Sequence, residues 1–308
     1  MKRGFKKVYT GIDIGRTMIT SAQVEWGGDG WHLISLGKKE LPEEVLHFSY
    51  KNSNILQKDA LAGTLCDVLS MNRNRGMTVG VALPNEIVKV AIQSFAELPE
   101  TEADIERMIS WTIEKNLHFQ AKSTKVSYYR IGWKNGVERM LVCAGTFSVI
   151  REYELLMKAV NIHPRIIHPQ GIAQFNFYSN QLPDRGVVAY LGLFERFFAV
   201  FVFIEGKLAF YQGIRKGFSD KHYLDDIDMC FEFYLNENPD NEIERLFIGG
   251  CLENRKNMQG VFSGLGNMDV RVMNELSTIG IGNRSGLGGN DDLALYAPAI
   301  GAAQSLLA

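Results

Sequence analysis

The sequence has few of the residues that mark disulfide-rich or metal-binding proteins. Its 308 residues include four cysteines, eight prolines and six histidines. The cysteines are far apart and show neither C-x-x-C spacing nor the density of a secreted disulfide scaffold. The histidines lack the spacing of metal ligands. We therefore expect single thiols in a reducing compartment and no metal site; the residues concerned are Cys66, Cys143, Cys230, Cys251, His32, His47, His118, His163, His168 and His222.

An excess of charge of one sign is also absent. The formal net charge is −2, from 33 basic and 35 acidic residues. Apart from a short basic start, the lysines and arginines are scattered, so the electrostatic pattern of a nucleic-acid-binding surface is missing. We expect no nucleic-acid partner.

Long apolar runs are missing as well. The most apolar region, residues 187–204, is interrupted by Gly192, Glu195 and Arg196, whereas a membrane span needs about 20 apolar residues. Asp13 interrupts the first apolar run, so the start does not match a signal peptide. We expect no direct insertion into a membrane.

The sequence does contain alternating strand and helix patterns over its whole length, which predict an α/β fold. Helices are expected around residues 60–69, 105–117, 150–160 and 223–234, with a terminal helix of small residues at 297–308. Strands are expected at 8–14, 19–26, 32–36, 77–83, 87–95, 126–133, 139–146, 165–168, 186–191, 197–204, 207–212 and 246–248.

The hairpin that opens the chain recurs at the start of its second half, at residues 186–212. Two similar α/β halves that face a cleft are the organisation of the actin and hexokinase superfamily. We therefore predict an actin-like, two-lobed α/β fold with ribonuclease H-like halves and a reduced second lobe. Residues 1–83 and 147–185 are expected to form the first lobe, 84–146 an inserted small α+β subdomain, and 186–308 the second lobe.

The inserted subdomain carries two local signals. Thr101 and Asp104 form a capping-box pattern at the start of its helix. Asn135-Gly136 is a strong hairpin signal between its last two strands. The pattern of strand, helix, strand and strand is therefore self-contained.

Two sets of motifs carry a family resemblance. The run from Gly11 to Thr17, Gly-Ile-Asp-Ile-Gly-Arg-Thr, resembles the first phosphate loop of actin-like ATPases. Further motifs follow one another in the order and spacing of the PilM family, which is related to the division protein FtsA. These motifs are Val81-Ala82-Leu83-Pro84, Val88-Lys89-Val90-Ala91-Ile92, Leu98-Pro99, Trp111 with Glu114-Lys115 and Phe119, and Phe231-Glu232-Phe233-Tyr234 leading to Arg245-Leu246-Phe247-Ile248-Gly249-Gly250.

The resemblance implies a set of properties. Members of the family are cytoplasmic, bind ATP with Mg between their lobes, and grip the N-terminal tail of PilN, an inner-membrane pilus protein. It implies no catalytic residue here. The cofactor-binding residues that it implies are Asp13, Gly15, Arg16, Thr17, Gly192, Gly249 and Gly250.

The sequence departs from the family where nucleotide chemistry is concerned. Thr20 stands where a lysine usually reaches phosphate, and Arg16 stands where the loop is normally small. Tyr190 is interpreted as replacing the aspartate of the second phosphate loop, and the subdomain that forms one wall of the adenine pocket is nearly absent. We therefore expect weak or absent nucleotide binding, and no complete Mg–phosphate site.

These observations favour a scaffold protein of a type IV pilus-type assembly machine. It is expected to lie at the inner membrane through a PilN-like partner, with formation of a homo-oligomer left open. Two alternatives stay open. One is a functional actin-like ATPase that changes its lobe angle with ATP. The other is the cytoplasmic part of a type II secretion platform protein, against which we note that no membrane helix follows before Ala308.

Overall fold

The computed structural model describes residues 7–28, 30–70, 78–117, 123–134, 136–218, 220–250, 260–262, 264, 268–281 and 292–307. Several sequence predictions lie outside these residues, namely those on His118, Phe119, Asn135 and Cys251. Within the described residues, Cys66, Cys143 and Cys230 are free thiols. None of the described helices is long and apolar enough to cross a bilayer.

The first lobe is built on a six-stranded sheet of order β14-β3-β2-β1-β4-β8. Helices α1 (Lys58–Ser70) and α3 (Phe147–Ala159) cover its outer face and pack on Ile12 and Ile14. Since successive side chains of a strand point to opposite faces, Asp13 faces the inside of the molecule. The strands are β1 (Val8–Ile14), β2 (Met18–Gly27), β3 (Gly30–Glu40), β4 (Thr78–Leu83), β8 (His163–Pro169) and β14 (Gly280–Ile281).

The second lobe is built on a five-stranded sheet of order β11-β10-β9-β12-β13. Helix α5 (Tyr223–Glu237) covers its outer face and packs on Ala189 and Leu191. Tyr190 therefore faces inward, where it joins the core between the two sheets. The strands are β9 (Val187–Phe194), β10 (Phe197–Ile204), β11 (Lys207–Ile214), β12 (Arg245–Gly249) and β13 (Asp269–Val272).

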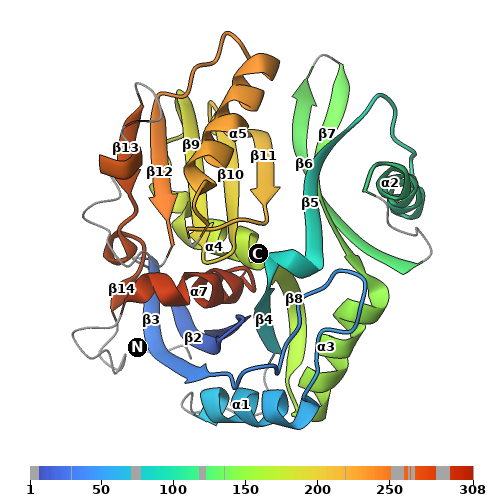
Figure 1. Cartoon of the computed structure of the whole chain (residues 1–308), viewed down its shortest axis with the longest axis vertical. Coiled ribbons are helices and arrows are strands. Elements are labelled where there is room, and N and C mark those ends of the chain that lie inside the picture. The colour runs from blue at the N-terminus through green and yellow to red at the C-terminus, as the bar shows by residue number, and fades with distance from the viewer. Residues whose placement is uncertain are drawn as a thin grey trace.

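Two helices, α4 (Gln170–Tyr178) and α7 (Ala297–Gln304), lie between the sheets (Figure 1). Glycines allow them to approach closely. A Cβ on Gly11 of β1 would lie 1.8 Å from the carbonyl oxygen of Ala299, and one on Gly301 would lie 1.8 Å from that of Ala173. The small residues of the terminal helix are thus explained by backbone-to-backbone packing.

The inserted subdomain is a separate three-stranded sheet of order β5-β7-β6, with helix α2 (Glu102–Leu117) on one face. The side chain of Thr101 accepts a hydrogen bond of 3.2 Å from the backbone N–H of Asp104 and caps that helix. Val88 is paired with Gly145, so the chain enters and leaves the subdomain at neighbouring points. The strands are β5 (Val88–Phe95), β6 (Thr124–Lys134) and β7 (Val137–Thr146).

The inserted subdomain also contacts the second lobe. The Nζ of Lys134 donates a hydrogen bond of 2.7 Å to the Oδ1 of Asn238. The guanidinium of Arg139 donates to the carbonyl oxygen of Ala209. These contacts connect the subdomain to the second lobe.

Two features of the fold differ from the sequence predictions. Helix α4 was not predicted, because it has no capping residue and begins directly after Pro169 at the end of β8. The segment 186–308 was assigned to the second lobe, but β14 pairs with β3 and α7 packs on Gly11 and Gly80, which belong to the first sheet. The end of the chain therefore returns to the first lobe. Short 3-10 turns complete the described structure at η1 (Asn85–Ile87), η3 (Ser179–Gln181), η4 (Glu275–Ser277) and η5 (Leu293–Tyr296).

Candidate functional site

Asp13 is the second-last residue of β1, at its carboxyl end, and is 8 % exposed. Its Oδ1 accepts a hydrogen bond of 2.7 Å from the Nε2 of Gln170, the first residue of α4. Burial raises the pKa of Asp13 to about 7, and the hydrogen bond from Gln170 offsets only part of that effect. Burial therefore favours the neutral, protonated form of this carboxyl group.

The turn after Asp13 contains the predicted residues Gly15, Arg16 and Thr17. The backbone N–H of Gly15 donates to the carbonyl oxygen of Met18 at 3.0 Å. The carbonyl oxygen of Thr17 accepts from the N–H of Leu41 at 2.8 Å. The turn is thus closed by its own backbone and by the neighbouring strand.

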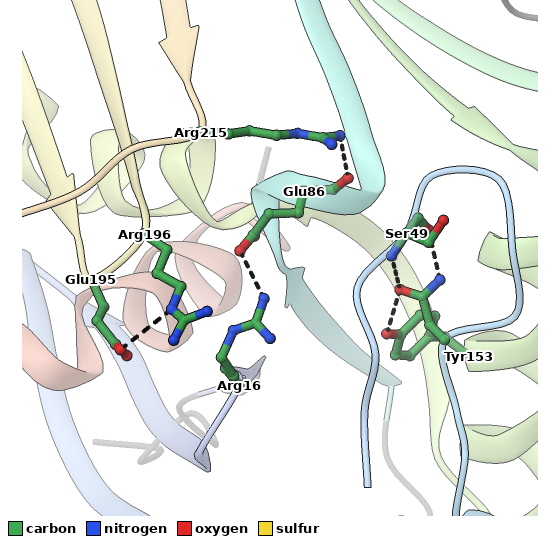
Figure 2. A network of polar contacts seen from close by, with 8 residues as sticks. Arg16, Ser49, Glu86, Tyr153, Glu195, Arg196 and Arg215 are labelled. Carbon is green, nitrogen blue, oxygen red and sulfur yellow. Dashed lines mark hydrogen bonds and ion pairs between the residues drawn. The ribbon is translucent and has the colours of Figure 1, made fainter. Parts of the chain in front are cut away.

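The side chain of Arg16 is held against the first lobe. Its guanidinium lies 4.6 Å from the ring centre of Phe48 and 3.4 Å from a carboxylate oxygen of Glu86. Figure 2 shows this contact together with an ion pair between Glu195 and Arg196, the two residues that connect β9 to β10. In that pair the Nε of Arg196 lies 3.7 Å from the Oε1 of Glu195. The charge of Arg16 is therefore already paired within the protein.

The register of the second hairpin corrects one prediction. Asp13 is paired with Thr20, and Gly192 is paired with Ala199, so that six residues lie between the members of each pair. Tyr190 is paired with Phe201, with ten residues between them. The position equivalent to Asp13 is therefore Gly192 and not Tyr190. The prediction matched Gly192 with Gly15, but the turn lies two residues further along the chain from Gly192 than from Gly15, which cannot be seen without the strand pairing.

Gly192 is covered by side chains. A Cβ at this position would lie 2.7 Å from the Oε1 of Gln174 on α4. That oxygen accepts a hydrogen bond of 2.8 Å from the hydroxyl group of Tyr190. The place of the second carboxylate is thus occupied by an amide and a phenol.

Gly249 is the last residue of β12 and is paired with Gly192, and Gly250 follows it. A Cβ on Gly249 would lie 2.7 Å from the hydroxyl oxygen of Tyr190, and one on Gly250 would lie 2.3 Å from the carbonyl oxygen of Leu193. Gly250 also has φ of +133°, a conformation that favours glycine. Close packing thus accounts for both glycines without a ligand.

These residues do not fit a Mg–phosphate group. Asp13 is a single carboxylate with a raised pKa, Gly192 supplies none, and Arg16 is paired with Glu86. Among the described residues, no three His, Cys, Asp or Glu side chains gather closely enough to hold a metal ion. We therefore derive no chemical step through a nucleotide. Gln170 and Gln174 fill the site, and they were missed because helix α4 was not predicted. The signal that could have identified them is that polar side chains follow directly after the strand that ends at Pro169.

A larger feature lies elsewhere, between the inserted subdomain, the first lobe and the second lobe. This apolar groove has a volume of about 840 Å³. The rings of Phe201 and Phe203 stack on Phe175 of α4 with centroids 4.9 and 5.3 Å apart. The groove is lined by Ser127, Tyr128, Tyr129, Arg130, Ile131, Leu141, Cys143, Ile166, His168, Ile172, Phe175, Asn176, Ser179, Phe201, Phe203, Gly206, Lys207, Leu208, Gln304 and Ser305.

The edge of β6 borders the apolar groove. Five consecutive residues, Ser127 to Ile131, line it, whereas one face of a strand would contribute only alternate residues. β6 is also the last strand of its sheet, so its outer side pairs with no strand of the described chain. The groove therefore offers an unpaired strand edge beside a row of stacked aromatic rings.

No family model and no curated protein matches the sequence. The structure is similar to a solved PilM-PilN type IV pilus biogenesis complex, with a TM-score of 0.80 at 13% identity over 96% of this chain and 98% of that chain. It is also similar to a Bacteroides thetaiotaomicron protein with an actin-like ATPase fold, with a TM-score of 0.54 at 13% identity over 96% of both chains. A third similar structure is the cytoplasmic domain of EpsL, an inner-membrane component of the Vibrio cholerae type II secretion system, with a TM-score of 0.52 at 10% identity over 98% of this chain and 96% of that chain. The predicted fold is confirmed: this chain has the actin-like fold.

Proposed function

We propose that this protein is an adaptor of a type IV pilus-type assembly machine, which holds the cytoplasmic tail of a PilN-like inner-membrane protein in the apolar groove. The observation that carries the proposal is the contrast between the two candidate sites. The apolar groove is large and bordered by an unpaired strand edge. The phosphate loops are filled by side chains of the protein itself.

The groove suits an extended peptide. A peptide that adds to a strand edge gains main-chain hydrogen bonds, and its alternate side chains enter neighbouring pockets. Here the edge of β6 would supply the hydrogen bonds, and Phe175 and Phe203 would contact apolar side chains of the tail. The similarity to a solved PilM-PilN complex supports the choice of partner.

In this proposal the protein acts at the inner membrane through its partner and carries out no catalysis. Tail binding does not depend on nucleotide, because Asp13 and Gly192 are engaged by α4. The rival function is an ATPase that changes its lobe angle. It requires Mg-ATP to bind, and a ligand at 100 times its Kd stabilises a protein by about 2.7 kcal/mol.

The test is a calorimetric titration of the full chain with a synthetic PilN-type tail peptide, using two matched variants. Tyr129 and Trp133 both lie on β6 and are 73% and 68% exposed, but only Tyr129 lines the groove. Tyr129→Ala is expected to weaken binding at least tenfold, whereas Trp133→Ala leaves it unchanged. Equal effects of the two substitutions would contradict the assignment of the groove.

The same titration in the presence of Mg-ATP separates the two functions. The adaptor proposal expects one affinity with and without nucleotide, and no change in Tm when Mg-ATP is added. A large rise in Tm together with a changed peptide affinity would favour the ATPase.

A further inference from the structure

A second cavity, of about 540 Å³, lies beside strand β5 of the inserted subdomain. Residues of the first and the second lobe line it as well. Two cationic residues, Lys89 and Arg215, line it, and no carboxylate does. We call it the cationic cavity. The other residues that line it are Tyr50, Asn85, Val88, Val90, Ala91, Phe197, Tyr211, Gln212 and Gly213.

Positive charge is concentrated around the ring of Tyr50, which lines this cavity. The Nζ atoms of Lys51 and Lys89 lie 5.4 and 5.1 Å from the ring centre of Tyr50, and the Cζ of Arg215 lies 5.1 Å from the same centre. Cations attract the face of an aromatic ring but repel one another. Three cations around one ring therefore favour the approach of an anion.

Among the described residues, no carboxylate group forms an ion pair with Arg215. Its guanidinium donates a hydrogen bond of 2.7 Å to the backbone carbonyl oxygen of Glu86. The carboxylate of Glu86 is turned the other way and pairs with Arg16 (Figure 2). A carbonyl group and a ring hold Arg215 in place without neutralising it.

Asn85 adds a buried polar group to the wall of the cavity. It is 4% exposed, and its Oδ1 accepts a hydrogen bond of 2.8 Å from the N–H of Gly171. This bond defines which amide atom is the oxygen. The Nδ2 on the other side has no hydrogen-bond partner among the described residues. This Nδ2 is itself buried, so Asn85 gives the wall a neutral side chain and no negative charge.

We propose that the cationic cavity binds a small organic anion, whose phosphate or carboxylate group is held by Lys89 and Arg215. A volume of about 540 Å³ is in the range of small-molecule sites and much larger than an inorganic phosphate needs. The ligand is therefore larger than a lone phosphate group, and its body would contact Phe197 and Tyr211. This site is separate from the apolar groove, and the inference does not depend on the proposed adaptor function.

The test is a titration of the full chain with phenyl phosphate and with benzoate as probes, and with benzyl alcohol as the neutral control. Both anions are expected to bind in the millimolar range or tighter, and the alcohol is not. The tighter of the two anions identifies the headgroup. Binding should weaken as salt is added, because exposed charges are screened.

Variants locate the site. Arg215→Gln and Lys89→Gln are each expected to weaken anion binding at least tenfold. The matched control is Lys216→Gln, since Lys216 is adjacent in sequence but does not line the cavity and is paired with Asp226 at 2.7 Å. Asn85→Asp keeps the acceptor for Gly171 and adds a negative charge, so it should also abolish anion binding. The Tm of each variant shows that it is folded.

Three results would overturn the proposal: no binding of either anion at millimolar concentration, equal binding of the alcohol, or equal losses in Lys216→Gln and Arg215→Gln. The adaptor function is tested separately, because Tyr129→Ala should leave anion binding unchanged. Arg215→Gln should likewise leave binding of the tail peptide unchanged.

Discussion

The amide of Gln170 donates its hydrogen bond to the carboxyl group of Asp13 at 2.7 Å, across the junction of α4 and β1. This contact places a neutral side chain where the actin-like resemblance implies a hydrated metal. It also leaves Asp13 with a pKa raised to about 7 by burial. The dependence of the unfolding free energy on pH can therefore show whether the carboxyl group of Asp13 is protonated in the folded protein.

Asp13→Asn is expected to stabilise the protein above pH 7. A raised folded-state pKa means that the folded protein binds more protons than the unfolded chain between pH 4 and 7, so the native carboxyl costs stability as the pH rises through this window. The full shift corresponds to an upper limit of about 4 kcal/mol. Urea unfolding at pH 4 and at pH 8 measures the difference, with a gain expected at pH 8 alone. A loss of stability at pH 8 would show that the ionised carboxylate is stabilising.

His168 should make the stability of the protein depend on pH in the opposite direction. Burial lowers its pKa from 6.5 to about 4, so the folded protein resists protonation and stability is lost as the pH falls from 6.5 towards 4. In the wild type this slope opposes that of Asp13. In Asp13→Asn the loss below pH 6.5 should become visible, and adding His168→Leu should flatten it. Tm measured across this pH range in both variants is the check, and an unchanged profile in the double variant would contradict the assignment.

Gly192→Asp, which restores a carboxylate at the position equivalent to Asp13, should not restore nucleotide binding. The new Cβ would lie 2.7 Å from the Oε1 of Gln174, and the cost of overpacking and of burying a charge is about 2 kcal/mol or more. Urea unfolding should show this loss, and Mg-ATP should not raise the Tm.

A double-mutant cycle with Gln174→Ala tests the cause of that loss. If the clash is responsible, Gly192→Asp costs less when Gln174 is already truncated, because residues in contact are not additive. Additive costs would mean that the destabilisation arises elsewhere.

Gly11→Ala should destabilise the protein by about 3 kcal/mol, because the added Cβ would lie 1.8 Å from the backbone oxygen of Ala299 on α7. Gly63→Ala is the matched control. It lies in α1 with nothing within 4 Å of the added Cβ, and it should stabilise by about 0.5 to 1 kcal/mol. Unfolding of both variants in urea measures the contrast, and a tolerated Gly11→Ala would show that α7 can move away from β1.

The sequence by itself determined most of the strands and four of the longer helices, because their apolar periods are strong and local. It also determined the recurring hairpin, which led to the two-lobed fold. The deficiency of the second phosphate loop was visible too, since no carboxylate stands at Tyr190 or Gly192.

Only the tertiary structure decided which residues occupy the candidate sites. The position equivalent to Asp13 depends on the pairing of β9 with β10, whose turn lies two residues further from Gly192 than the first turn lies from Gly15. Helix α4 has no local start signal, and its burial between two sheets stabilises it. The apolar groove and the cationic cavity collect residues from both lobes and the inserted subdomain. Contacts between residues so far apart in the chain leave no periodic pattern, because they depend on how the sheets and helices pack.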